Sequence, residues 1–331
     1  MAGIMNVKDL HSSWRGFISK YVWIFLLPTS VLIYGSHSIL LNLCKDERGK
    51  IVFNSAALVL MIELTKLLIS LALWLSDLSS GRDGGKSARI LPLTSCWMFA
   101  IPALLYAINN NLVVFIQEFM DPASFQILCN LKIVSTAFLY RIFLKNRLSF
   151  KQWLAIGLLL AGSVSNGLAG ITSSGRSRSL SEIYVTIPGL LLILIYCSIS
   201  GMSGIYTEYI LKKYKQVSLH QQNVFLYLFG LVFNSVGYIM TSRGSSDDSL
   251  RGFFTGFSTW TVVIILTQSL NGMIMGYLFK HGNNIMRLFT ISASMLVTTV
   301  FSVIIFSLQL NVFFYMALLS VMFALWLYYN K

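Results

Sequence analysis

The chain has 331 residues, of which 56% are hydrophobic and only 11% are charged, and its mean hydropathy is +0.71. A soluble domain carries roughly 25% charged residues, so this composition excludes a soluble globular protein. The net charge of +13 would be typical of a nucleic-acid-binding protein. Here the basic residues fall mainly in short loops, where they face the headgroups of a lipid bilayer, so nucleic acid is excluded as a partner.

Apolar runs of roughly 18 or more residues recur along the chain, and each predicts a transmembrane helix. We therefore expect an all-α polytopic membrane protein with ten transmembrane helices in a single domain, 1–331. The first span, after Lys20, is predicted to be a signal anchor that stays in place. The ten predicted spans cover residues 21–43, 53–76, 93–117, 122–143, 150–170, 183–211, 222–241, 258–280, 285–307 and 311–329.

Loop charge predicts the orientation of these spans. With the N-terminus in the cytosol, fifteen lysines and arginines lie on the cytosolic side and seven on the opposite side. The positive-inside rule therefore favours cytosolic termini at both ends. Three cations fall within spans instead, namely Lys66, Lys132 and Arg287.

The two halves of the chain, 1–170 and 183–331, show a weak internal similarity. Residues 109–148 and 271–310 share a helix–turn–helix pattern ending in Leu-Ser or Leu-Asn, at a constant offset of 162 residues. Five spans in each half would make the halves cross the membrane in opposite senses. Two inverted five-helix repeats are typical of transporters, with the substrate site at their interface.

Lys132 is the clearest functional candidate. It lies about ten residues into the fourth predicted span, which places it near the bilayer centre. An ammonium group in hydrocarbon is costly unless an anion or a wet cavity meets it. The lysine either binds a phosphate or carboxylate in a cavity or pairs with a buried acid such as Glu63.

Other charged residues allow two interpretations each. Glu63 and Lys66 are three residues apart on one helical face, so they form a structural pair or contribute to a site or gate. Glu208 is expected to pair with the lysines that follow it. Lys280 and Arg287 flank a predicted cytosolic turn, where they would attract anionic substrates or contact lipid.

Polar and aromatic residues in the spans are further candidates. The amides Asn109, Asn110 and Asn111 could bind a base, a ribose or one another across helices. Tyr106 and Tyr227 could stack on a base or belong to the core. The small residues of the fifth and sixth spans fit close helix packing, either within one chain or in an oligomer.

Sequence motifs for catalysis are missing. The chain has no Walker loop, no HExxH, no GxSxG and no paired intramembrane carboxylates. The four cysteines are widely spaced, without a metal-ligand pattern. We therefore expect no enzyme activity, no ATP-driven transport, no cofactor and no metal.

Seven stretches in order carry a resemblance to a known family. Together they resemble the nucleotide sugar transporters of solute carrier family 35, subfamily A, in the drug/metabolite transporter superfamily. The stretches are ELTKL at 63–67, YAINNNL at 106–112, DPASFQILCNLKI at 121–133, LKNRLSFKQW at 144–153, YTEYILKK at 206–213, QNVFLYLFG at 222–230 and FKHGNNIMR at 279–287.

The resemblance implies ten helices in two inverted halves, a Golgi or endoplasmic reticulum membrane, and exchange of a cytosolic nucleotide sugar for a lumenal nucleoside monophosphate. It also implies substrate-binding roles by position. Tyr106, Asn109 and Asn110 would contact the nucleotide, Phe125 would pack on it and Lys132 would meet the phosphate. The remaining site residues it implies are Asn223, Tyr227, Asn271 and Lys280.

The sequence departs from the family pattern at three places. Phe125 stands where relatives carry Tyr, Phe229 stands where a relative carries Ser, and Gly282-Asn283-Asn284 replaces Thr-Asp-Asn. Loss of hydroxyls reduces discrimination for polar sugar groups. We therefore expect a Golgi antiporter for a UDP-, CMP- or CDP-linked sugar or sugar alcohol. The alternatives are a non-transporting partner in a homo- or hetero-oligomer with related transporters, and a small-metabolite exporter of the same fold.

Overall fold

The computed structural model describes residues 7–44, 46, 52–79, 90–116, 118–120, 122–145, 148–173, 185–242, 253–306 and 311–329. Most of the charged loops used to predict orientation fall outside these residues. The helices are α1 (Val7–Leu43), α2 (Ser55–Ser79), α3 (Leu93–Cys96), α4 (Ala100–Ile116), α5 (Pro122–Leu128), α6 (Lys132–Phe143), α7 (Phe150–Ser173), α8 (Ile187–Lys213), α9 (Leu219–Ser242), α11 (Thr259–His281), α12 (Asn284–Phe306) and α13 (Val312–Tyr329).

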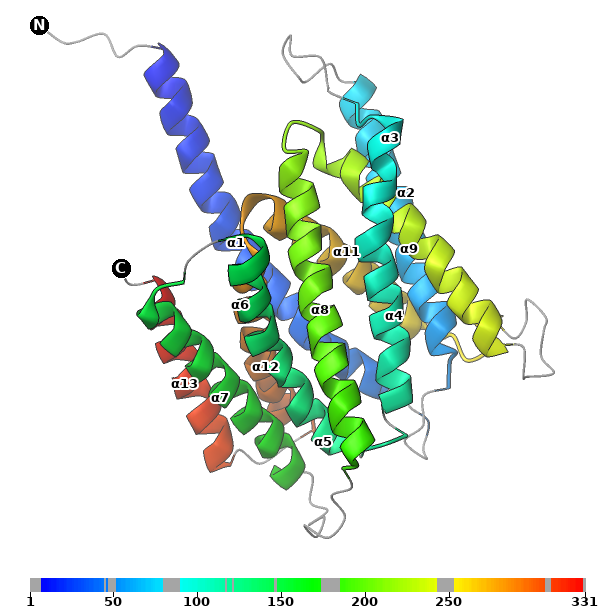
Figure 1. The fold of residues 1–331 in the computed structure, drawn as a ribbon, viewed down its shortest axis with the longest axis vertical. Coiled ribbons are helices and arrows are strands. Elements are labelled where there is room, and N and C mark those ends of the chain that lie inside the picture. The colour runs from blue at the N-terminus through cyan, green and yellow to red at the C-terminus, as the bar shows by residue number, and fades with distance from the viewer. Residues whose placement is uncertain are drawn as a thin grey trace, which may run out of the picture.

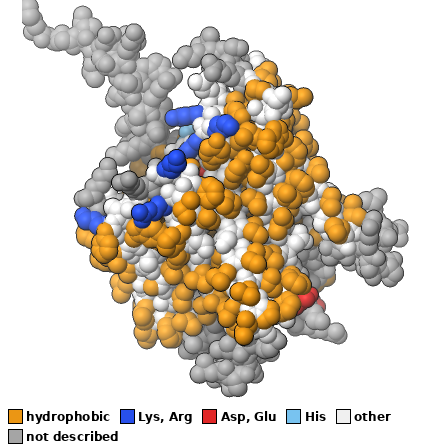
Figure 2. Space-filling model, in the orientation of Figure 1, with side chains coloured by type: hydrophobic (Ala, Val, Ile, Leu, Met, Phe, Trp, Pro, Cys, Tyr) orange, Lys and Arg blue, Asp and Glu red, His pale blue; other side chains and the backbone are white. Residues whose placement is uncertain are grey.

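The described part of the chain is an all-α bundle (Figure 1). Nine of its helices are long and apolar enough to cross a membrane. Large apolar side chains cover much of the face seen in Figure 2. Exposed apolar residues of the bundle include Ile142, Leu319 and Ile304, at 64%, 66% and 72% exposure. Such a surface is stable in lipid rather than in water. The prediction of an all-α polytopic membrane protein is confirmed.

The predicted fourth span is not one continuous α-helix. It consists of α5 and α6, joined by a 3₁₀ turn at Cys129–Leu131. Lys132 is the first residue of α6, directly after this turn. The tighter turn changes the helical register there, which is common where a helix contributes to a functional site.

Prolines mark two other helix features. Pro102 has no N–H to bond the carbonyl four residues earlier, and a 3₁₀ turn at Trp97–Phe99 lies at that place in the third span. Pro188 opens α8, where the Thr186 hydroxyl accepts a hydrogen bond from the Gly189 N–H at 3.2 Å. Asp121, the predicted cap of the fourth span, lies outside the described residues.

The pairing of helices follows a regular pattern. Helix α2 packs on α9, and α7 packs on α13 at one edge of the bundle (Figure 1). The other main contacts are α1 with α12, α6 with α8, α4 with α8, α1 with α11, α4 with α9 and α2 with α11. If each span is replaced by the span five places further along or back, every pair in this set becomes a pair of the same set; for example, α1 with α12 becomes α8 with α6. Corresponding spans of the two halves therefore have corresponding neighbours.

Basic side chains gather at one end of the visible face, where α6 and α8 end (Figure 2). Arg141, Lys145, Lys151, Lys213 and Lys215 are all exposed. The apolar surface lies below them in the same view. This end has the character of a membrane–water interface rather than a lipid-facing wall.

Candidate functional site

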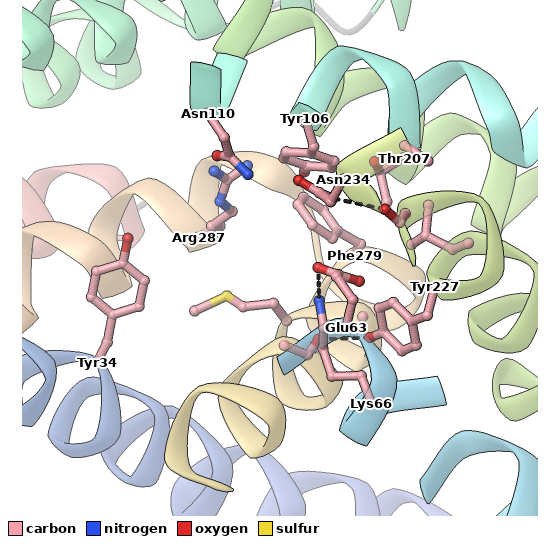
Figure 3. A pocket seen from close by; sticks show the side chains of 16 residues that line it. Tyr34, Glu63, Lys66, Tyr106, Asn110, Thr207, Tyr227, Asn234, Phe279 and Arg287 are labelled. Atoms are coloured by element: carbon pink, nitrogen blue, oxygen red, sulfur yellow. Dashed lines mark hydrogen bonds and ion pairs between the residues drawn. The ribbon is translucent and has the colours of Figure 1, made fainter. Parts of the chain in front are cut away.

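A cavity of about 240 Å³ lies inside the bundle, between helices of both halves (Figure 3). Its walls come from α1, α2, α4, α8, α9, α11 and α12. The lining residues are Tyr34, Glu63, Lys66, Ala103, Tyr106, Asn110, Thr207, Leu226, Tyr227, Gly230, Asn234, Gly272, Met275, Gly276, Phe279 and Arg287.

Helical spacing explains which side chains of α4 and α9 reach the cavity. Tyr106 and Asn110 are four residues apart, so they share one face of α4. On α9, Tyr227 and Asn234 are seven residues apart and lie on one face, two turns from each other. Both helices thus present an aromatic ring and an amide to the cavity.

An ion pair forms part of the wall. The Lys66 ammonium lies 2.5 Å from Glu63 Oε1, and the two side chains are only 12% and 17% exposed. The same ammonium lies 4.5 Å from the centre of the Tyr227 ring. Tyr227 in turn donates a hydrogen bond to the Gly272 carbonyl at 3.2 Å. This wall therefore joins α2, α9 and α11 and carries no net charge.

Two glycines allow that ion pair to sit between helices. A Cβ atom at Gly272 would lie 2.7 Å from Lys66 Cδ, and one at Gly230 would lie 3.0 Å from Glu63 Oε2. Real Cβ atoms essentially never approach another atom to 2.7 Å, and 3.0 Å is closer than in most real contacts. Gly272 and Gly230 therefore provide space for the charged side chains of α2.

The side of the cavity opposite this ion pair carries a positive charge, that of Arg287. Arg287 and Asn110 point into the cavity toward one another, and Tyr34 lies on the same side (Figure 3). Arg287 donates a hydrogen bond of 3.4 Å to Asn284 Oδ1 and lies 5.4 Å from the centre of the Phe279 ring. These contacts are to neutral groups.

The structure places five of the sequence-predicted residues around one cavity. These are Tyr106, Asn110 and Tyr227, with the pair Glu63 and Lys66. They come from three helices far apart in the sequence. Both interpretations of the pair are compatible with this position, because it stabilises the wall and faces the cavity at once.

Three other predicted residues, Asn109, Asn223 and Asn271, are buried without lining the cavity. The side-chain oxygen of each has no hydrogen-bond partner. Asn223 lies behind the wall, beside Gly276, where a Cβ would meet its Oδ1 at 3.1 Å. Buried amides normally find hydrogen-bond partners, so these three oxygens are exceptions within the described part of the chain.

Phe125 and Lys132 are not among the residues that line the cavity. The Phe125 ring packs on Tyr196, with ring centres 5.6 Å apart. Lys132 is partly buried and lies within electrostatic range of Tyr34, Tyr196 and Arg287. Glu63 forms its ion pair with Lys66 and not with Lys132.

Lys280 is bound by a backbone carbonyl outside the cavity wall. Its side chain is buried, and its ammonium donates a hydrogen bond of 2.5 Å to the Val217 carbonyl, in the connection between α8 and α9. It does not line the cavity. The hydrogen bond holds the end of α11 against that connection.

Glu208 forms a second polar cluster at the end of α8, here called the Glu208 network. Its carboxylate is 1% exposed and lies 2.6 Å from the Lys212 ammonium, as the sequence predicted. It also accepts a hydrogen bond of 2.7 Å from the Asn284 N–H. Lys212 donates another, of 2.6 Å, to the Gly282 carbonyl. The network therefore ties α8 to the turn between α11 and α12.

Sequence reasoning did not select Tyr34, Thr207 and Asn234 as lining residues. Asn234 interrupts the apolar run LVFNSVG, and an amide in such a run is a usable signal. Tyr34 and Thr207 carry no such signal, because single hydroxyl-bearing residues are common in membrane helices. Only the packing of α1 and α8 brings them to the cavity.

The chain matches the nucleotide-sugar transporter family over residues 18–329. It is 47% identical to the Xenopus tropicalis protein named probable UDP-sugar transporter protein SLC35A4, over 97% of this chain and 96% of that one. The human protein of the same name is 39% identical, over 99% of this chain and 100% of that one. The Danio rerio protein of that name is 44% identical, over 93% and 94%.

The chain therefore belongs to the nucleotide-sugar transporter family, which comprises transporters and not enzymes. A solved crystal structure of a protein superposes with a TM-score of 0.64 at 12% sequence identity, covering 91% of this chain and 94% of that one. At this identity the likeness concerns the fold alone.

Proposed function

We propose that this chain is a Golgi antiporter that exchanges a pyrimidine nucleotide-linked sugar or sugar alcohol for a nucleoside monophosphate. The observation that carries the proposal is the cavity itself. In a chain of this family, it combines tyrosine rings, amides and cations at the interface of the two halves. Aromatic faces suit a base, amides suit a base or ribose, and cations suit phosphate.

Among the candidate substrates, UDP-linked sugars come first. The relatives from frog, fish and human are all named probable UDP-sugar transporters. CMP- and CDP-linked compounds are the next candidates, because an amide such as that of Asn110 can pair with either pyrimidine.

The proposed mechanism is alternating access by two inverted five-helix repeats, 1–170 and 183–331. The symmetric pairing of helices supports this division, since corresponding spans have corresponding neighbours. The cavity supports it as well, because α1, α2 and α4 of the first half face α8, α9, α11 and α12 of the second. One half would rock against the other around the bound substrate.

In this proposal, the positive charge of Lys132 near the cavity explains why transport would be a strict exchange of one nucleotide for another. Lys132 lies at the start of α6, and its side chain has no carboxylate among its electrostatic neighbours in the described part of the chain. A carrier with such a cation reorients at lower cost when an anion is bound. The empty carrier would then return slowly, which enforces antiport.

We propose that both termini and the basic end of the bundle face the cytosol. The exposed basic residues at the ends of α6 and α8 support this orientation. Accessibility of cysteines introduced near each end in sealed Golgi vesicles tests the orientation directly. Labelling of the α6–α7 connection from the lumen would contradict it.

Uptake of labelled UMP and CMP into proteoliposomes tests the transport proposal. The vesicles are preloaded with either monophosphate or left empty, and uptake is expected only into preloaded vesicles. Lys132→Ala should abolish exchange while expression is unchanged. Equal uptake into empty vesicles would contradict antiport, and absence of uptake of either nucleotide would favour the non-transporting partner.

A further inference from the structure

The basic end of the bundle carries five exposed cations, none of which belongs to the two ion pairs found in the described part of the chain. The five are Arg141, Lys145, Lys151, Lys213 and Lys215. The first three surround the connection between α6 and α7 and are here called the α6–α7 basic patch. A concentration of positive charge that the protein does not neutralise itself indicates an external anion.

The α6–α7 basic patch lies at the edge of the bundle, where α7 packs on α13 and lipid can reach it (Figure 1). Arg141 belongs to the last turn of α6, and Lys151 is the second residue of α7. Lys145 follows the end of α6 with a φ of 53°. Glycine is the usual residue at such a left-handed helix end, and a lysine is uncommon there. The turn keeps the three cations at the same end of two neighbouring helices.

Exposed apolar side chains lie one helical turn from two of these cations, on the side away from the basic end. Phe138 precedes Arg141 by three residues on α6, and Leu154 follows Lys151 by three residues on α7. The Phe138 ring packs on Trp153 with ring centres 4.9 Å apart, so the two helices share an aromatic surface. Cations beside an exposed apolar surface suit a ligand with an anionic head and acyl chains.

Lys213, at the end of α8, has a different environment from the α6–α7 basic patch. Its ammonium lies 5.8 Å from the centre of the Tyr209 ring, 5.6 Å from that of Tyr214 and 3.8 Å from Met98 Sδ. Aromatic rings at these distances stabilise a cation. Helix α8 also packs on α4, α6 and α11, which places its end further inside the bundle than the α6–α7 connection. The patch is therefore the better site for a lipid headgroup.

We propose that the α6–α7 basic patch binds the headgroup of a phosphoinositide, an anionic lipid whose inositol ring carries a phosphate monoester. Three cations match a headgroup with several negative charges better than the single net charge of phosphatidylserine. The Arg141 guanidinium can donate two parallel hydrogen bonds to the phosphate oxygens, and the acyl chains would lie along Phe138 and Leu154. The site is separate from the cavity, so this inference does not depend on the proposed transport function.

Binding of short-chain phosphatidylinositol 4-phosphate to the purified full-length protein in detergent tests the site. Microscale thermophoresis compares wild type with a triple variant, Arg141→Gln, Lys145→Gln and Lys151→Gln. Each cation near an anionic lipid contributes roughly fivefold in affinity, so the triple variant should bind roughly a hundredfold more weakly. Melting temperatures without lipid establish that the variant is folded, and little change is expected because all three side chains are exposed.

The matched control combines Lys213→Gln with Lys215→Gln, which removes two exposed cations at the same end of the bundle. Its loss of affinity for each removed charge should be much smaller than that of the triple variant. An equal loss for each charge would overturn the site, because it indicates a general attraction between a basic surface and an anionic lipid. Absence of binding to wild type would overturn it as well.

Two further ligands separate a lipid site from a site for free phosphate. Inositol 1,4-bisphosphate, the same headgroup without acyl chains, should bind wild type more weakly than the lipid, because the apolar contacts are missing. Equal affinity for the free headgroup would overturn the lipid assignment. Short-chain phosphatidylserine should also bind more weakly, and equal affinity for it would overturn the preference for a phosphate monoester.

Discussion

Two ion pairs of the same chemistry lie in different surroundings within the described part of the chain. Glu63–Lys66 on α2 and Glu208–Lys212 on α8 each join a glutamate to a lysine within about one helical turn. The first pair lines the cavity, with both side chains mostly buried. The second has a fully buried glutamate, while its lysine is 37% exposed.

The difference lies in what else each pair contacts. Glu208 also binds the Asn284 N–H and Lys212 the Gly282 carbonyl, so that pair joins helices across the bundle. The hydrogen bond of Glu63–Lys66 stays within α2, and the pair otherwise contacts the Tyr227 ring and open cavity. Spacing along a helix therefore predicts an ion pair, whereas the surrounding elements determine whether it serves stability or a binding site.

Glu208→Ala should have the largest effect on stability. It leaves the Asn284 N–H without its partner and removes the anion opposite Lys212, and breaking a buried pair in this way costs about 3 kcal/mol. Equilibrium unfolding of the purified protein in mixed micelles measures the loss. Glu118→Ala, at an exposed glutamate, is the control. Similar losses for the two variants would show that the Glu208 network contributes little.

Gly204→Ala should have the second-largest effect on stability, because its methyl group would press on Arg287 and Asn284 together. Overpacking of this kind costs about 1–3 kcal/mol. Gly157→Ala is a matched control, since a Cβ at Gly157 meets nothing within 4 Å. Helix propensity predicts that this control is stabilised by about 0.5–1 kcal/mol. The same equilibrium unfolding assay measures the stability of both variants. Equal stability of Gly204→Ala and Gly157→Ala would contradict the close packing inferred at Gly204.

Glu63→Gln should reduce stability by about 1 kcal/mol, less than Glu208→Ala, because the released Lys66 charge faces a cavity that water can enter. The second expected effect of Glu63→Gln is a gain, and it concerns ligand affinity rather than stability. The freed ammonium should increase the affinity for UMP, which calorimetry measures, and adding Lys66→Met should cancel that increase. Unchanged or weaker UMP binding in Glu63→Gln would mean that the pair does not control the charge of the cavity.

Tyr227→Phe should have the smallest effect. It removes one hydrogen bond of 3.2 Å to the Gly272 carbonyl and keeps the ring beside Lys66, so we expect a loss of about 0.5–1 kcal/mol. Thermal unfolding of the variant beside wild type provides the measurement. A loss as large as that of Glu208→Ala would make the α2 wall as important for stability as the Glu208 network.

Much of this molecule was predictable from local patterns. Apolar runs of membrane-spanning length predicted the helices; eight of the ten predicted spans lie in single long helices, while the third span is interrupted at Trp97–Phe99 and the fourth at Cys129–Leu131. Spacing predicted that Glu208 pairs with a lysine that follows it, and it made the pairing of Glu63 with Lys66 one of two interpretations. The first turns of α1 were missed, because the stretch from Val7 to Lys20 is too polar to predict a membrane span.

The site was predictable only in part. Tyr106, Asn110 and Tyr227 line the cavity, whereas Lys280 fastens a connection and Phe125 packs on Tyr196. The roles of all these residues in binding stay predictions. A motif indicates which positions are chemically suited to a ligand, but which side of a helix faces a cavity depends on its neighbours.

The sequence by itself therefore determined the membrane class, the approximate limits of the spans and the pairing of Glu208 with a following lysine, since these depend on hydrophobicity and spacing within one segment. Tertiary structure alone decided that Tyr34 and Arg287 share a cavity with Lys66, and that Lys280 does not. Those relations join residues up to 253 positions apart, from Tyr34 on α1 to Arg287 on α12. They arise from packing, in which glycines at 204, 230 and 272 determine how closely the charged side chains approach neighbouring helices.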